Sequence, residues 1–125
     1  MIEIEKTLKN IFTSEGRLNR LRYVKYILIL ALFFGIIGVI LDLLVTAVAG
    51  KESFLMTVVN AVLSIAVGFG SAMLQIRRLH DMDKSGWFVL LSAVPGINCL
   101  FGIYLLLVKG TDGTNRYGYD PLLMD

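Results

Sequence analysis

The chain has 125 residues, so one domain over residues 1–125 is expected. Its composition excludes an ordinary soluble domain, because 56% of the residues are hydrophobic, only 18% are charged and the mean hydropathy is +0.72. A net charge of +2, without a stripe of Lys and Arg between aromatic residues, excludes nucleic acid as the expected partner. A single cysteine and a single histidine exclude an internal disulfide and a Cys/His zinc site, and we expect no cofactor.

The first segment, residues 1–13, is predicted to form an amphipathic helix. Ile4, Leu8, Ile11 and Phe12 recur at helical spacing, and charged or polar residues fill the other faces. A short helix of this kind lies on the bilayer surface beside the first membrane span. A solvated, frayed N-terminus is the alternative.

A basic segment with two tyrosines, residues 15–26, leads into the first long apolar run. Basic residues and interfacial tyrosines before such a run mark the cytoplasmic end of a membrane span. As a helix, Tyr26 to Ala49 would be about 35 Å long, which is enough to cross a bilayer. We therefore predict a transmembrane helix over residues 23–49, interrupted only by Asp42.

The second predicted span, residues 54–76, carries no charge. Asn60, Ser64, Gly68 and Ala72 follow one another at four-residue spacing, so they share one helix face. Small and polar residues on one face are typical of close helix packing in membranes. The sequence thus predicts a packing seam on this helix.

Asp42 is the residue that fits a span least well. An ionised carboxylate there costs about 2.5–3.5 kcal/mol, so it should be paired, protonated or turned toward other helices. We expect Asp42 and Asn60 to meet at one depth in the membrane, with Asn98 as a possible third member. The group is either a proton or cation site, or a hydrogen bond that locks the helices; a shallow Asp42 wetted by the interface is the other alternative.

The third apolar run, residues 87–108, is broken by Pro95-Gly96. We predict one span kinked at this break; the alternative is a hairpin that re-enters the membrane, whose halves are each too short to cross. Residues 109–125 form a polar, turn-rich tail. The predicted fold is therefore all-α and polytopic, with three transmembrane helices and an N-terminal surface helix.

The distribution of positive charge predicts the orientation. With three spans, nine Lys and Arg residues share a side with the N-terminus and three lie opposite, so the N-terminus is cytoplasmic and the tail outside. With a hairpin the balance becomes eleven to one, and the tail is cytoplasmic. Charge alone leaves the side of the tail open.

The polar stretch between the second and third runs, residues 75–87, contains most of the candidate site residues. Arg77 and Arg78, with Arg17 and Arg20, anchor the helix ends or bind the phosphate of anionic lipid head groups in bidentate fashion.

The same stretch holds the candidates for catalysis and metal binding. His80 and Asp81 are candidates for acid–base chemistry, and Asp81 with Asp83 is a weak candidate for a divalent cation site. Fixing the loop by hydrogen bonds is the alternative role for all three residues.

Three patches resemble the domain-of-unknown-function-805 family of small bacterial inner-membrane proteins. They are Gly16 to Tyr23, then Arg77 to Asp81 with Lys84 to Trp87, and a tail patch from Gly110 to Pro121. The resemblance covers roughly residues 8 to 121, with Val24 in place of the usual tryptophan and Asp112, Thr114 and Tyr119 where proline is common. It implies a bacterial inner-membrane location and no particular activity.

The leading functional hypothesis is a non-enzymatic membrane module whose basic cytoplasmic face binds anionic lipid or a partner protein. We also expect self-association or a larger membrane partner. The first alternative is a small transporter or channel subunit that uses Asp42 and the seam of Asn60, Ser64 and Gly68. The second is a membrane enzyme that acts on lipid head groups through His80 and Asp81.

Overall fold

The computed structural model describes residues 2–123. The described residues do not include Met1, at the start of the predicted surface helix, or Met124 and Asp125, at the end of the predicted tail. No strand forms within the described part, so the all-α prediction is confirmed there. The elements in order are α1 (Ile2–Ile11), α2 (Arg20–Ala49), α3 (Phe54–Asp81), the 3₁₀ helix η1 (Gly86–Ala93), α4 (Ile97–Leu107) and the 3₁₀ helix η2 (Pro121–Leu123).

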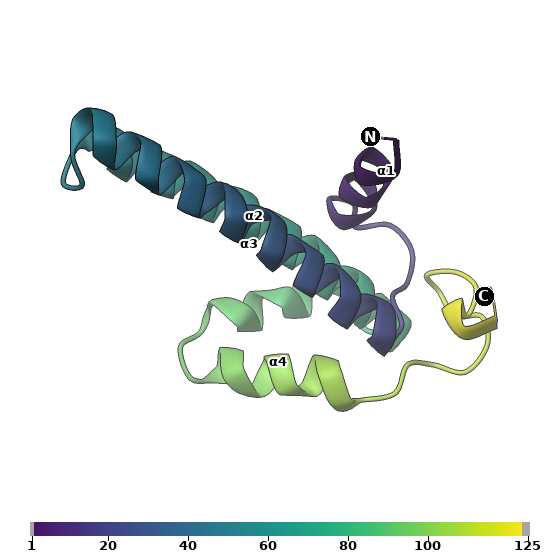
Figure 1. The fold of residues 1–125 in the computed structure, drawn as a ribbon. Helices are drawn as coiled ribbons and strands as arrows, with labels where there is room; N and C mark the ends of the chain where they lie inside the picture. Colours follow the sequence, from purple (N-terminus) through teal and green to yellow (C-terminus); the bar gives the residue numbers. More distant parts are fainter. Residues whose placement is uncertain (1, 124–125) are drawn as a thin grey trace.

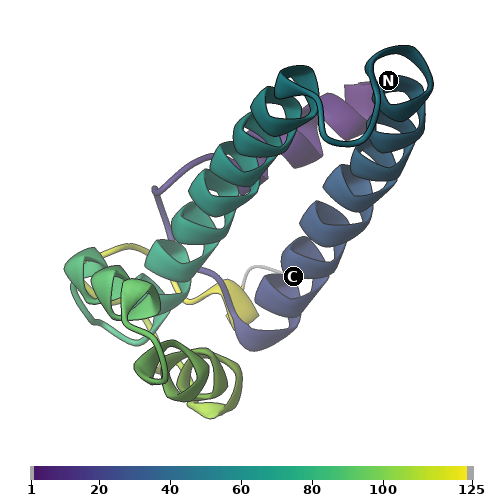
Figure 2. The same ribbon diagram turned by 90° about the vertical axis from the view of Figure 1, so that its left-hand side faces the viewer.

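The helices α2 and α3 form a long antiparallel pair (Figures 1 and 2). Asn19 and Ser53 cap their N-termini by accepting hydrogen bonds from the backbone N–H groups of Arg22 and Met56. Gly50, with φ of 87°, allows the tight turn between them. Among the described helices, α2 and α3 are long and apolar enough to cross a bilayer, and most of their apolar side chains face outward.

The third apolar run does not form the single kinked span that we predicted. It folds into a hairpin, in which η1 leads away from the end of α3 and α4 returns beside it (Figure 1). The chain reverses at Pro95-Gly96, where Gly96 has φ of 83°, a conformation that side chains with a Cβ rarely adopt. The hairpin brings the start of the tail back to the C-terminal end of α3.

The hydrophobic core lies at this same end of the long helical pair. Leu18, Leu74, Leu79 and Leu105 are fully buried there, so the linker after α1, the end of α3 and α4 share one core. Farther along α3, Gly70 lets the side chains of Leu30 and Phe12 approach the helix backbone closely. In Figure 1, α1 points away from the long axis of the pair.

Most of the predicted seam on α3 is not used for packing within the chain, because Asn60, Ser64 and Gly68 are exposed and only Ala72 is half-buried. The face that α3 turns toward α2 includes Leu63 and Gly70 instead. Residues four apart drift around a helix by about 40° at each step, so the seam turns away from α2.

The predicted group of Asp42, Asn60 and Asn98 is not joined by hydrogen bonds among the described residues. All three residues are exposed. The hairpin explains the position of Asn98, because α4 returns toward the polar end of the molecule instead of continuing across.

Candidate functional site

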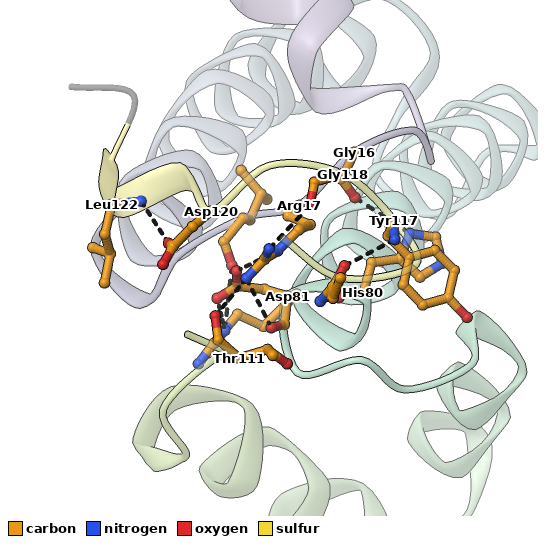
Figure 3. A network of polar contacts seen from close by, with 12 residues as sticks. Gly16, Arg17, His80, Asp81, Thr111, Tyr117, Gly118, Asp120 and Leu122 are labelled. Carbon is orange, nitrogen blue, oxygen red and sulfur yellow. Dashed lines mark hydrogen bonds and ion pairs between the residues drawn. The ribbon is translucent and has the colours of Figure 1, made fainter. Parts of the chain in front are cut away.

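The three polar patches of the sequence meet at one end of the α2–α3 pair (Figure 3). Arg17 comes from the linker before α2, Asp81 ends α3, and Thr111 to Asp120 come from the tail. Leu18 N donates to the Arg77 carbonyl oxygen at 3.1 Å, which ties the linker to α3. The site is therefore assembled from segments up to about 100 residues apart in the chain.

Asp81 lies at the centre of this site. Its carboxylate accepts hydrogen bonds from Arg17 Nε at 3.0 Å and from Arg78 Nη1 at 2.8 Å. The side chains of Arg17, Arg78 and Asp81 are 1%, 0% and 5% exposed. Arg78 and Asp81 are three residues apart in the last turn of α3, so the helix itself sets their pairing. We call these three residues the buried cluster.

The guanidinium of Arg17 also binds the tail. It donates to the carbonyl oxygens of Thr111 at 2.7 Å, Gly113 at 2.6 Å and Gly118 at 3.1 Å. A planar guanidinium presents five N–H donors in a fixed fork, and here several backbone acceptors surround it. Arg17 therefore holds the tail in a loop around its own side chain.

Arg78 binds the return helix in the same manner. It donates to the carbonyl oxygens of Leu105 at 2.8 Å and Leu18 at 3.3 Å, and to that of Val108. The last carbonyl groups of a helix have no partners within it, so α4 ends on this buried arginine. One side chain thus connects the end of the hairpin to α3 and to the linker before α2.

The backbone of the tail completes the connection to α3. Thr111 N donates to the Asp81 carbonyl oxygen at 2.7 Å, and Asn115 Nδ2 donates to that of His80 at 2.8 Å. Asp120 accepts from the N–H groups of Gly113 at 2.9 Å and Leu122 at 3.0 Å. These two donors lower the pKa of Asp120 below its ordinary value, because they stabilise the carboxylate.

His80 and Asp83 hold the outer edge of the site. The imidazole of His80 stacks on Tyr117, with centroids 3.8 Å apart, and its Nδ1 lies 3.3 Å from the Gly16 carbonyl oxygen. Asp83 forms an exposed ion pair with Arg116 at 3.1 Å. Both residues therefore contact the tail, which is the loop-fixing role that the sequence left open.

The predicted head-group arginines divide into two classes. Arg17 and Arg78 are buried and bonded inside the protein, so they are not accessible to lipid. Arg20 is exposed and donates to the Leu107 carbonyl oxygen at 3.2 Å. Arg77 is half-buried and donates to the Asn10 carbonyl oxygen at the end of α1.

The predicted catalytic and metal-binding carboxylates, Asp81 and Asp83, form ion pairs with arginines. The Asp81 carboxylate is shared by two arginines, so it presents no free base. Across residues 2–123 no group of three or more His, Cys, Asp or Glu side chains could hold a metal ion. Asp83 faces Arg116, whose positive charge opposes cation binding.

A cavity of about 190 Å³ lies beside the buried cluster, and we call it the polar cavity after its charged lining residues, although Leu21 and Leu122 also line it. Arg20 and Lys109 line it with Asp81, Thr111 and Asp120. Sequence reasoning did not assign a role to Lys109, Thr111 or Asp120. Thr111 and Asp120 belong to the tail patch, whose resemblance to the family was the signal that could have found them, and Lys109 lies immediately before it.

Comparison with known proteins gives a consistent result. The profile of the family described as "Protein of unknown function (DUF805)" matches residues 11–119. The protein named inner membrane protein YhaH, from Escherichia coli (strain K12), is 37% identical over 118 residues, covering 94% of each chain. Inner membrane protein YhaI of the same organism is 38% identical over 114 residues, covering 91% of this chain and 90% of its own. No solved structure matches the chain.

Proposed function

Since the chain belongs to the DUF805 family of proteins of unknown function, we propose a role from its own geometry: an inner-membrane module whose cytoplasmic end binds the head groups of anionic phospholipids. In this proposal α2 and α3 span the membrane, and η1 with α4 enters it only from the cytoplasmic side. The relatives named as inner membrane proteins support the location.

The lengths of the elements support two spans and a re-entrant hairpin. At about 1.5 Å per residue, the 30-residue α2 reaches about 45 Å, which exceeds the hydrocarbon core of about 30 Å. The 11-residue α4 reaches about 16 Å, or about one leaflet. Its exposed apolar side chains favour a place in that leaflet.

The charges support a cytoplasmic polar end. Of the twelve Lys and Arg residues, only Lys51 belongs to the turn at the far end of the helical pair. The other eleven belong to segments at or before the polar end, and cytoplasmic loops carry such an excess. Both the N-terminal segment and the tail then lie in the cytoplasm.

The observation that carries the head-group role is the surplus of positive charge around the polar cavity. Arg17 and Arg78 share the single carboxylate of Asp81, so the buried cluster keeps one positive charge in excess. Arg20 and Lys109 add two cations at the cavity. Lys109 also forms an ion pair with Asp112, but this pair is exposed, and exposed ion pairs contribute little binding free energy. Asp120 adds one carboxylate.

The positive surplus suits a phosphate group. Guanidinium groups bind phosphate in bidentate geometry, and each Lys or Arg near an anionic membrane surface contributes about 1 kcal/mol. Arg20 can turn its exposed guanidinium toward a phosphate at the cavity while the buried cluster keeps the cavity in place. The proposed ligand is therefore the phosphate of an anionic lipid head group.

Lipid retention tests this proposal. The protein is reconstituted in nanodiscs of mixed phosphatidylglycerol and phosphatidylcholine and is then extracted in mild detergent. The lipids that stay bound are quantified by mass spectrometry. Arg20→Gln and Lys109→Gln should each lower the preference for phosphatidylglycerol about fivefold, as expected for about 1 kcal/mol. Lys51→Gln, at the opposite end, is the control and should leave the preference intact.

Two outcomes would contradict the head-group role. The first is a wild-type protein that retains both lipids in proportion to their supply. The second is a double variant, Arg20→Gln with Lys109→Gln, that keeps the wild-type preference.

A further inference from the structure

We propose that the hairpin of η1 and α4 forms a binding site for one phospholipid, with an acyl chain between the two helices and the phosphate at Lys84. The inference rests on the proposed function for the membrane location and the anionic lipid class. It adds a second site, separate from the polar cavity at Arg20 and Lys109.

The site is an apolar cavity of about 430 Å³ between η1 and α4. This volume lies within the usual range for ligand pockets, about 300–1,000 Å³. Phe88 and Leu91 line it from η1, Phe101 and Tyr104 line it from α4, and Leu79 lines it from the end of α3. Its walls are therefore almost wholly hydrocarbon and aromatic.

Lys84 is the charged residue of this cavity, and its position is informative. It lies in the loop between α3 and η1, at the polar end, while Leu91 lies toward the tip of the hairpin. The cavity therefore runs from a cation at the cytoplasmic end to an apolar interior. That is the order of groups in an anionic phospholipid that enters from the cytoplasmic leaflet.

Lys84 has no competing anion. Within residues 2–123, no ion pair or hydrogen bond of its side-chain ammonium is formed, and the neighbouring carboxylate of Asp83 is paired with Arg116. The charge of Lys84 is thus uncompensated at the mouth of an apolar cavity, and a lipid phosphate is complementary to it. Trp87, three residues farther along the chain, is 79% exposed, as expected for an indole at the membrane interface.

Photochemical crosslinking tests the occupant. The protein is reconstituted in phosphatidylcholine nanodiscs that contain a small fraction of phosphatidylglycerol or phosphatidylcholine with a diazirine near the end of one acyl chain. After irradiation, the labelled peptides are mapped by mass spectrometry. We expect labelling concentrated on η1 and α4, several-fold stronger with the phosphatidylglycerol probe.

Two variants and two controls make the test specific. Leu91→Trp fills the cavity and should lower labelling of the hairpin several-fold, whereas Leu43→Trp on the exposed face of α2 should not. Lys84→Gln should reduce the preference for the phosphatidylglycerol probe about fivefold, whereas Lys51→Gln should keep it.

Each contrary result would overturn the inference. These are labelling spread evenly over α2 and α3, labelling that Leu91→Trp does not change, equal labelling by the two probes, and a crosslink from η1 or α4 to a second copy of the chain in place of lipid. Failure of the proposed head-group role is seen separately in the retention assay, because Leu91→Trp leaves Arg20 and Lys109 unchanged.

Discussion

Gly110 lies directly against Asp81. A Cβ placed on Gly110 would overlap a carboxylate oxygen of Asp81 and would lie 2.6 Å from its carboxyl carbon and 3.0 Å from its backbone oxygen. Real Cβ atoms do not approach other atoms so closely. The tail therefore passes over the buried cluster at the one residue type that leaves enough space, and the next residue, Thr111, bonds to the Asp81 carbonyl oxygen.

Gly110→Ala is expected to displace the tail from the end of α3. Overpacking at a tight contact costs about 1–3 kcal/mol, and here the added methyl group overlaps a carboxylate held by two arginines. Nitroxide mobility at Thr114→Cys, in a Cys99→Ser background, measures the displacement.

The control for this prediction is Gly102→Ala in α4. A Cβ there meets no atom within 4 Å, and alanine favours a helix by about 1 kcal/mol over glycine. The nitroxide at position 114 of the Gly102→Ala protein should stay as immobile as it is in the protein with Gly102 and Gly110 unchanged. Equal mobility in the Gly110→Ala and Gly102→Ala proteins would contradict the prediction.

Asp81→Asn is expected to destabilise the protein by about 3–5 kcal/mol, because it leaves Arg17 and Arg78 buried without a counter-charge. Thermal unfolding in detergent, followed by circular dichroism, measures the change. Asp83→Asn is the matched control, since its pair with Arg116 is exposed and worth about 0.2–1 kcal/mol.

Asparagine also suits the backbone at position 83, where φ is 56°. The control should therefore add no strain of its own. A loss in Asp81→Asn no larger than that in Asp83→Asn would show that the buried cluster is not a main support of the fold.

Thiol labelling from outside intact cells tests the predicted topology. In a Cys99→Ser background, Glu52→Cys in the α2–α3 turn should react with an impermeant reagent before lysis. Thr114→Cys in the tail should react only after lysis, because Arg17 and Asp81 tie the tail to the end that carries eleven of the twelve Lys and Arg residues. Labelling of Thr114→Cys in intact cells would contradict a cytoplasmic tail.

Low pH is expected to loosen the tail through Asp120. Its pKa is lowered in the folded protein, so the folded state binds fewer protons than the unfolded chain near pH 4. The contribution of Asp120 to stability is complete above about pH 4 and is lost as the pH falls through the lowered pKa.

The nitroxide at Thr114 should therefore become mobile below about pH 4 and stay immobile at pH 6. The Asp120→Asn protein should lack this part of the transition, because its amide does not titrate. Identical mobility profiles in the two proteins would remove Asp120 as the cause.

The sequence alone predicted the helical class and the positions of the two long helices. Apolar runs of more than 20 residues, the first interrupted only by Asp42, are local patterns, and α2 and α3 follow them. It also predicted which segments carry polar groups. It singled out Arg17, Arg78 and Asp81, because charges are rare in so apolar a chain, but not the tail residues that they bind.

The sequence did not decide the path of the third run. Pro95-Gly96 is compatible with a kink or with a reversal, and the choice depends on what the returning helix meets. In the structure α4 ends on Arg78, whose guanidinium binds the carbonyl oxygens of Leu105 and Val108. Contacts between residues about 30 positions apart thus select the hairpin.

The roles of the arginines were also set by tertiary structure. In the sequence Arg17 and Arg20 are equivalent basic residues of one motif, yet Arg17 is buried on Asp81 and Arg20 is exposed. Composition determined that cations gather at one end of the helices, since the bilayer excludes charge from the rest. Only the folded chain decided which cations are neutralised inside and which are exposed, because that depends on where the tail and the hairpin return.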